Sequence, residues 1–155
     1  MKKVYLFIFV ILGLLLTGCT SKEVKNTKTL DNFKTVAESN GFIVTDKLSD
    51  YQSQNADYIT GALLATLDDA EIEMVTYTDN ESAKKTLKTH LEAFKMMKSP
   101  SMTGSTSKGE NFEKHTIISN GYYGVTSRID DTLIFSKTLL KNKELVEKVF
   151  NDLGY

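Results

Sequence analysis

Apolar and polar positions along residues 29–155 alternate between helical and strand-like spacing. Over residues 29–40 the apolar side chains recur three or four positions apart, which predicts a helix that Thr29 caps and Gly41 ends. β-Branched and aromatic residues then predict a strand over residues 42–45. The polar composition of residues 46–57 indicates a turn-like connection.

The segment 58–67 leaves two alternatives open. Its Ala-Leu-Leu-Ala stretch favours a helix by propensity, but the run is short and contains Gly61. A second apolar run, in which polar and apolar residues alternate, follows almost at once over residues 72–77. The favoured prediction is therefore a hairpin of two strands that turns at residues 68–70.

The clearest helix covers residues 79–98 and carries an apolar stripe at Ala83, Leu87, Leu91 and Phe94. The following residues, 99–111, are rich in Ser, Thr and Gly. This composition offers little apolar surface to bury, so a mobile loop is predicted there.

The last third of the sequence predicts a meander of three strands, 112–119, 122–129 and 132–137, followed by a helix over residues 142–153. Asn120-Gly121 between the first two strands is a strong hairpin signal. The expected order of elements is α-βββ-α-βββ-α. The fold class is α+β, with an antiparallel sheet and helices packed on one face.

Residues 1–19 have the three-part layout of a secretory signal. Lys2 and Lys3 form a positive head, an apolar run covers residues 4–16, and small residues with Cys19 follow. A membrane-spanning helix needs about 20 apolar residues, and this run is shorter. A cleaved signal is therefore favoured over an uncleaved anchor.

The four residues Leu16-Thr17-Gly18-Cys19 resemble the lipobox of bacterial lipoproteins. In that family the chain is cut before the cysteine, which receives a diacylglycerol thioether and carries fatty acyl chains such as palmitate. The resemblance implies cleavage between Gly18 and Cys19, with residues 1–18 as signal peptide. It further implies a lipid-anchored tether over residues 19–28 and a single domain over residues 29–155, outside the cytoplasm at the cell membrane. The order of elements also resembles small lipoproteins of Gram-positive bacteria to which no activity is assigned.

Composition excludes several classes of function. Without Lys2 and Lys3 the chain carries 17 basic and 20 acidic side chains, and Arg128 is its single arginine. A mildly acidic domain of this kind gives no electrostatic case for nucleic-acid binding. Cys19 is the single cysteine, so an internal disulfide is excluded, and lipidation would also remove its thiol chemistry.

His90 and His115 are the two histidines of the chain, and each has a glutamate two residues away, Glu92 and Glu113. On a strand, Glu113 and His115 would share a face. No zinc-protease or nucleophile-elbow motif accompanies either histidine. A cluster of four carboxylates over residues 68–73 fits an acidic turn better than a calcium loop, because the spacing of an EF-hand is absent.

The sequence therefore favours a non-catalytic binding or interaction module, attached to the membrane through Cys19. It does not identify the partner, and a protein partner is one open option. No catalytic residue, metal ligand or cofactor is assigned. Two alternatives stay open: a small hydrolase that uses His90 or His115 with carboxylates, and a carrier of a small ligand or metal. One cleft holding both histidines and residues 99–111 would favour these alternatives.

Overall fold

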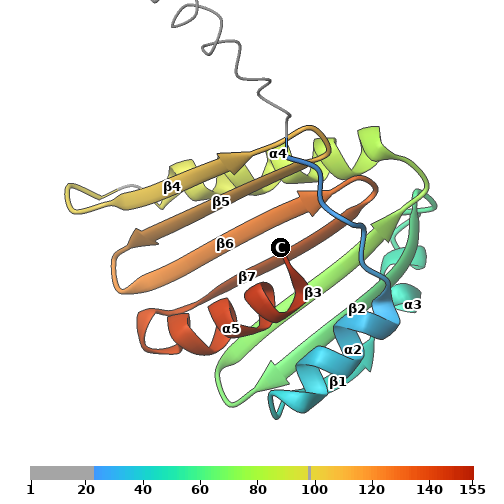
Figure 1. The fold of residues 1–155 in the computed structure, drawn as a ribbon, viewed down its shortest axis with the longest axis horizontal. Coiled ribbons are helices and arrows are strands. Elements are labelled where there is room, and N and C mark those ends of the chain that lie inside the picture. Colours follow the sequence, from blue (N-terminus) through green and yellow to red (C-terminus); the bar gives the residue numbers. More distant parts are fainter. Residues whose placement is uncertain (1–22, 98) are drawn as a thin grey trace, which may run out of the picture.

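A computed structural model describes residues 23–97 and 99–155, which form one antiparallel seven-stranded sheet with helices on both faces (Figure 1). The strands lie in the order β1-β2-β3-β7-β6-β5-β4. In these residues no helix is long and apolar enough to cross a bilayer. The elements in chain order are α2 (Leu30–Ser39), β1 (Ile43–Asp46), α3 (Leu48–Gln52), β2 (Ile59–Leu67), β3 (Ala70–Tyr77), α4 (Asn80–Met96), β4 (Thr103–Lys108), β5 (Phe112–Ser119), β6 (Tyr122–Ile129), β7 (Thr132–Leu139), the 3₁₀ helix η1 (Leu140–Asn142) and α5 (Lys143–Leu153).

The domain has two hydrophobic cores, and two adjacent residues of β3 belong to different ones. Met74 belongs to a buried cluster with Phe33 of α2 and Val149 of α5. Val75 belongs to a second cluster, which contains Leu87 of α4. Successive residues of a strand point to opposite faces, so α2 and α5 cover one face, and α4 with the short α3 covers the other. The predicted α+β class with an antiparallel sheet is confirmed, but the placement of all helices on one face is wrong.

Two segments that were predicted to lack regular structure are in fact regular. Leu48–Gln52 forms α3, where the Leu48 N–H donates to the Asp46 carboxylate over 2.8 Å. Thr103–Lys108, inside the predicted loop, forms the edge strand β4 and pairs with β5. The predicted order α-βββ-α-βββ-α is therefore wrong. Small polar residues form a strand here because the neighbouring backbone of β5 supplies hydrogen bonds, which composition alone does not reveal.

The turns and the helix cap that were predicted from neighbouring residues are confirmed. The hairpin β2–β3 is confirmed over the helical alternative, with Asp68 at its turn in a left-handed conformation (φ 50°). Asn120 and Gly121 both have positive φ angles, 52° and 77°, as a tight hairpin turn requires. At the start of α2 the Thr29 hydroxyl accepts the Asn32 N–H over 3.1 Å, which confirms the predicted cap.

The predicted tether is in contact with the domain from Glu23 onward. The Glu23 carbonyl accepts the Glu110 N–H over 2.9 Å at the turn between β4 and β5. Two residues later, the Lys25 backbone exchanges two hydrogen bonds with the Asn111 side chain, 2.9 and 2.8 Å long. Cys19 and Gly18 lie outside the described residues.

Candidate functional site

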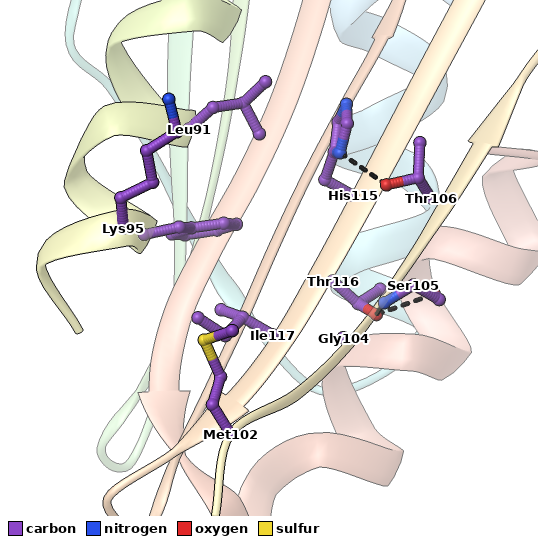
Figure 2. Close-up of a pocket in the computed structure, with 10 residues that line it drawn as sticks. Leu91, Lys95, Met102, Gly104, Ser105, Thr106, His115, Thr116 and Ile117 are labelled. Atoms are coloured by element: carbon purple, nitrogen blue, oxygen red, sulfur yellow. Dashed lines mark hydrogen bonds between the residues drawn. The ribbon is translucent and has the colours of Figure 1, made fainter. Parts of the chain in front are cut away.

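A hollow of about 430 Å³ lies between the C-terminal half of α4 and the β4–β5 hairpin (Figure 2). One helix and two strands therefore supply its walls. The apolar side chains that line it are Leu91, Phe94, Met102 and Ile117. The polar side chains that line it are Lys95, Ser105, Thr106, His115 and Thr116.

Two glycines shape this hollow. At Gly124 of β6, a Cβ would lie 2.8 Å from the Ile117 side chain and 2.9 Å from the Phe94 ring. The Phe94 ring therefore packs directly on the backbone of the sheet at Gly124. At Gly104 of β4, a Cβ would lie 2.7 Å from the Thr116 carbonyl oxygen, so only glycine lets β4 approach β5 this closely.

His115 lies between a carboxylate and a hydroxyl. Its Nε2 is 2.8 Å from Glu113 Oε1, its Nδ1 is 2.9 Å from Thr106 Oγ1, and Lys108 Nζ lies 3.1 Å from the other Glu113 oxygen. Burial raises the pKa of Glu113, but hydrogen bonds from His115 and Lys108 outweigh it and keep that pKa below its usual range. An ionised Glu113 requires the proton on Nε2, so in the neutral ring Nδ1 accepts from the Thr106 hydroxyl.

His90 lies on the side of α4 that faces the sheet and is partly buried. Its ring centroid is 4.3 Å from that of Phe135, and its Nδ1 is 3.1 Å from Thr126 Oγ1. Burial lowers the pKa of His90 to about 4, so the ring is neutral at physiological pH. His90 borders a separate, smaller hollow with Phe135 and Lys137.

Thr126 of β6 lies between the two histidines. It is directly opposite His115 in the β5–β6 pairing, and it contacts His90. Opposed side chains of an antiparallel pair are about 5 Å apart at Cβ, so both histidines lie on the face that α4 covers. They do not line the same hollow, however. His115 meets the segment predicted as a loop, and His90 lines a separate hollow. Among the described residues, the two histidines therefore do not share the hollow that would favour a hydrolase or a carrier.

The sequence located part of this site. Glu113 and His115 share a face as predicted, whereas Glu92 is paired with Lys95 at 2.7 Å on α4. Thr106 was missed because a strand made of Ser, Thr and Gly shows no apolar alternation. Phe94 was predicted as core, and its helical spacing could not show that it faces a hollow.

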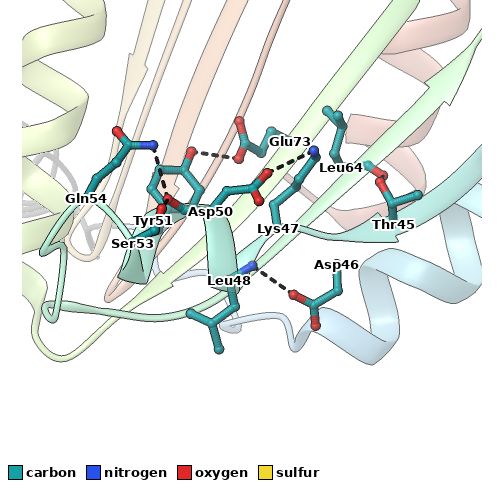
Figure 3. A network of polar contacts seen from close by, with 10 residues as sticks. All are labelled: Thr45, Asp46, Lys47, Leu48, Asp50, Tyr51, Ser53, Gln54, Leu64 and Glu73. Carbon is teal, nitrogen blue, oxygen red and sulfur yellow. Dashed lines mark hydrogen bonds and ion pairs between the residues drawn. The ribbon is translucent and has the colours of Figure 1, made fainter.

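A second polar network fastens α3 to the sheet (Figure 3). The Tyr51 hydroxyl donates to Glu73 Oε1 over 2.6 Å, and Lys47 Nζ lies 3.0 Å from Asp50 Oδ2. Burial is the main cause that raises the pKa of Glu73, against the hydrogen bond from Tyr51. The Tyr51 hydrogen bond holds α3 against β3, and it gives the Glu73 carboxylate a partner within the protein.

The acidic segment 68–73 does not converge on a common centre. Asp69 pairs with Lys141 at 2.7 Å, and Glu73 is engaged by Tyr51. In the described part of the chain, no three His, Cys, Asp or Glu side chains are grouped so that they could hold a metal ion.

No family model and no curated protein sequence matches the chain. Among solved structures, it is similar to a crystal structure described as a GTP binding regulator from Thermotoga maritima, with 18% identity and a TM-score of 0.48. The similarity covers 84% of this chain and 91% of the other. A likeness this distant carries no argument about what the chain binds.

Proposed function

We propose that this chain is a membrane-anchored extracytoplasmic lipoprotein whose domain is a non-catalytic binding module. Support for the anchor comes from Leu16-Thr17-Gly18-Cys19, which follows a positive head and an apolar run. The single observation that carries the binding role is the hollow between α4 and the β4–β5 hairpin, because most of the surface that lines it is apolar.

The surroundings of the hollow favour a protein partner. Three large apolar side chains at the same end of the sheet are exposed: Met96 (88%), Met102 (38%) and Tyr122 (41%). Grouped apolar exposure of this kind is typical of protein interaction sites. The partner inserts an apolar side chain into the hollow, against Phe94 and Ile117, and the exposed side chains enlarge the contact.

Loss of the lipid anchor is the first test. Cys19→Ala is expected to abolish detergent-phase partitioning or to leave the signal attached, because the thioether would form at that sulfur. The measurement is phase partitioning together with the intact mass, and Thr20→Ala is the matched control. Unchanged partitioning and an unchanged lipid mass in the Cys19 variant would contradict the anchor.

A small hydrolase is the second candidate, and one observation favours it. Thr106, His115 and Glu113 form a hydroxyl–imidazole–carboxylate chain beside the hollow. Such a chain activates a hydroxyl when the imidazole accepts its proton. The same contacts also give three polar side chains at the edge of the sheet their hydrogen-bond partners. This structural role accounts for the contacts without any catalytic activity.

One pair of variants tests binding and separates the two candidates. Phe94→Ala is expected to weaken binding of the apolar dye anilinonaphthalene sulfonate about tenfold, since a lost aromatic contact of roughly 1.4 kcal/mol has that effect. Thr106→Val, the control on the polar wall, removes no apolar surface and should not weaken dye binding. The measurement is a fluorescence titration at matched melting temperature. Equal dye affinity in both variants would contradict the binding site, and nitrophenyl ester hydrolysis that Thr106→Val abolishes would favour the hydrolase.

A further inference from the structure

The connection between the lipid and the domain is short. The chain is already hydrogen-bonded to the domain at Glu23, whose carbonyl accepts the Glu110 N–H. Four peptide steps separate Cys19 from Glu23, and they span at most about 14 Å even when fully extended. If contact began only at Thr29, the same connection would span about 35 Å.

Residues 23–28, hereafter the strap, are fastened to three separate parts of the domain. Asn111, after the β4–β5 turn, exchanges two hydrogen bonds with the backbone of Lys25. Asp130, in the β6–β7 turn, accepts from both the Thr27 hydroxyl (2.7 Å) and Asn111 Nδ2 (2.8 Å). The Lys25 ammonium donates to the Gly154 carbonyl oxygen over 3.0 Å.

The strap lies at one end of the sheet, and Met96, Met102 and Tyr122 lie at the other. β5 runs from the turn beside the strap to the Asn120-Gly121 turn, and its eight residues span about 26 Å. Figure 1 shows the β4–β5 and β6–β7 turns together at the strap end, with the C-terminal end of α4 and the β5–β6 turn at the opposite end.

We propose that the strap orients the anchored domain, so that the β4–β5 and β6–β7 turns face the bilayer. The end bearing Met96, Met102 and Tyr122 then points away from the membrane, toward a partner approaching from outside. This inference rests on the proposed lipid anchor. The surface that meets the lipid headgroups is the strap with the two turns it contacts.

Charge attraction does not account for this orientation. The strap and the two turns together carry four acidic side chains, Glu23, Glu110, Asp130 and Asp131, against the two lysines Lys25 and Lys28. The Lys25 ammonium is also occupied by a backbone carbonyl and lies 4.7 Å from the Phe112 ring centroid. The orientation therefore follows from the length of the connection. It is expected on zwitterionic as well as anionic lipid.

The orientation can be measured with the full-length lipidated protein in phosphatidylcholine vesicles that contain a nitroxide-headgroup lipid. Because Cys19 carries the lipid, an introduced cysteine is the only thiol available for a fluorophore. Glu110→Cys places the label at the strap end, and Met96→Cys places it at the exposed opposite end. Quenching is expected to be several-fold stronger at position 110 than at position 96.

Two variants identify the strap as the cause. Asn111→Ala removes both hydrogen bonds to the Lys25 backbone and a third to Asp130, which itself holds Thr27, and it is expected to bring the two quenching values together. A Gly-Ser insertion between Thr20 and Ser21 leaves every described residue in place and should have the same effect if Asn111→Ala fails to fold.

Each outcome decides a different question. A protein that does not float with the vesicles contradicts the lipid anchor, and with it the proposed function. A protein that floats but shows equal quenching at both positions contradicts only the orientation. Unequal quenching that survives the insertion, or that requires anionic lipid, contradicts the strap as its cause.

Discussion

Replacing His90 with glutamine is expected to remove a pH dependence of stability between about pH 6.5 and pH 4. Burial lowers the pKa of His90 from 6.5 to about 4 in the folded domain. Between these values the unfolded chain binds a proton that the folded domain does not, so the free energy of unfolding falls as the pH falls. The full shift corresponds to at most about 3 kcal/mol.

The measurement is urea unfolding of the wild-type protein and His90→Gln at several pH values from 8 to 4. Other titrating groups affect both proteins alike, so the difference between the two curves isolates the histidine. We expect the wild-type protein to lose stability relative to the variant as the pH falls through this window. Parallel curves would show that His90 is protonated equally well in both states.

Phe150→Ala is expected to lower the free energy of unfolding by about 3–5 kcal/mol, the range for a buried aromatic side chain replaced by alanine. Phe150 lies on α5 with none of its surface exposed, in the cluster that also contains Ile134 and Met74. Its loss leaves a cavity between α5 and the sheet that rigid strands cannot close. This is a large share of the stability of a domain of this size.

Met96→Ala provides the matched control for this prediction. Met96 is helical like Phe150 but 88% exposed, so its replacement should change stability by no more than about 0.5 kcal/mol. Urea unfolding measures both variants. A loss at Phe150 as small as that at Met96 would contradict the packing of α5 on this face.

A buried arginine connects the sheet to α4, the helix that covers one of its faces. Arg128 of β6 is only 4% exposed and donates from Nη1 to Asn80 at the start of α4 (2.8 Å) and to the Asp130 carbonyl oxygen (2.9 Å). The side chain therefore ties the first turn of α4 to the sheet. In the sequence, Arg128 stands as a lone arginine, which argues against nucleic-acid binding but does not show which neighbours will surround the side chain.

The helix caps, the tight turns and most strands were predictable because they depend on near neighbours in the chain. Thr29 caps α2 through a residue three positions away, and Asn120-Gly121 supplies the backbone conformation of its own turn. The contact between Glu113 and His115 was predictable for the same reason, since residues two apart on a strand share a face. The resemblance to a lipobox also rests on consecutive residues, and it stays a prediction.

Tertiary structure alone decided the features that depend on distant partners. β4 forms because the backbone of β5 pairs with it. Helices cover both faces of the sheet because β3 is buried on both faces. Residues 23–28 lie on the domain because two turns far along the chain bind them through hydrogen bonds. The hollow beside Phe94 depends in the same way on Gly104 and Gly124, whose missing side chains have meaning only once the strands are paired. Near-neighbour preferences leave such contacts undetermined, because their free energy comes from burial and backbone pairing between segments that only folding brings together.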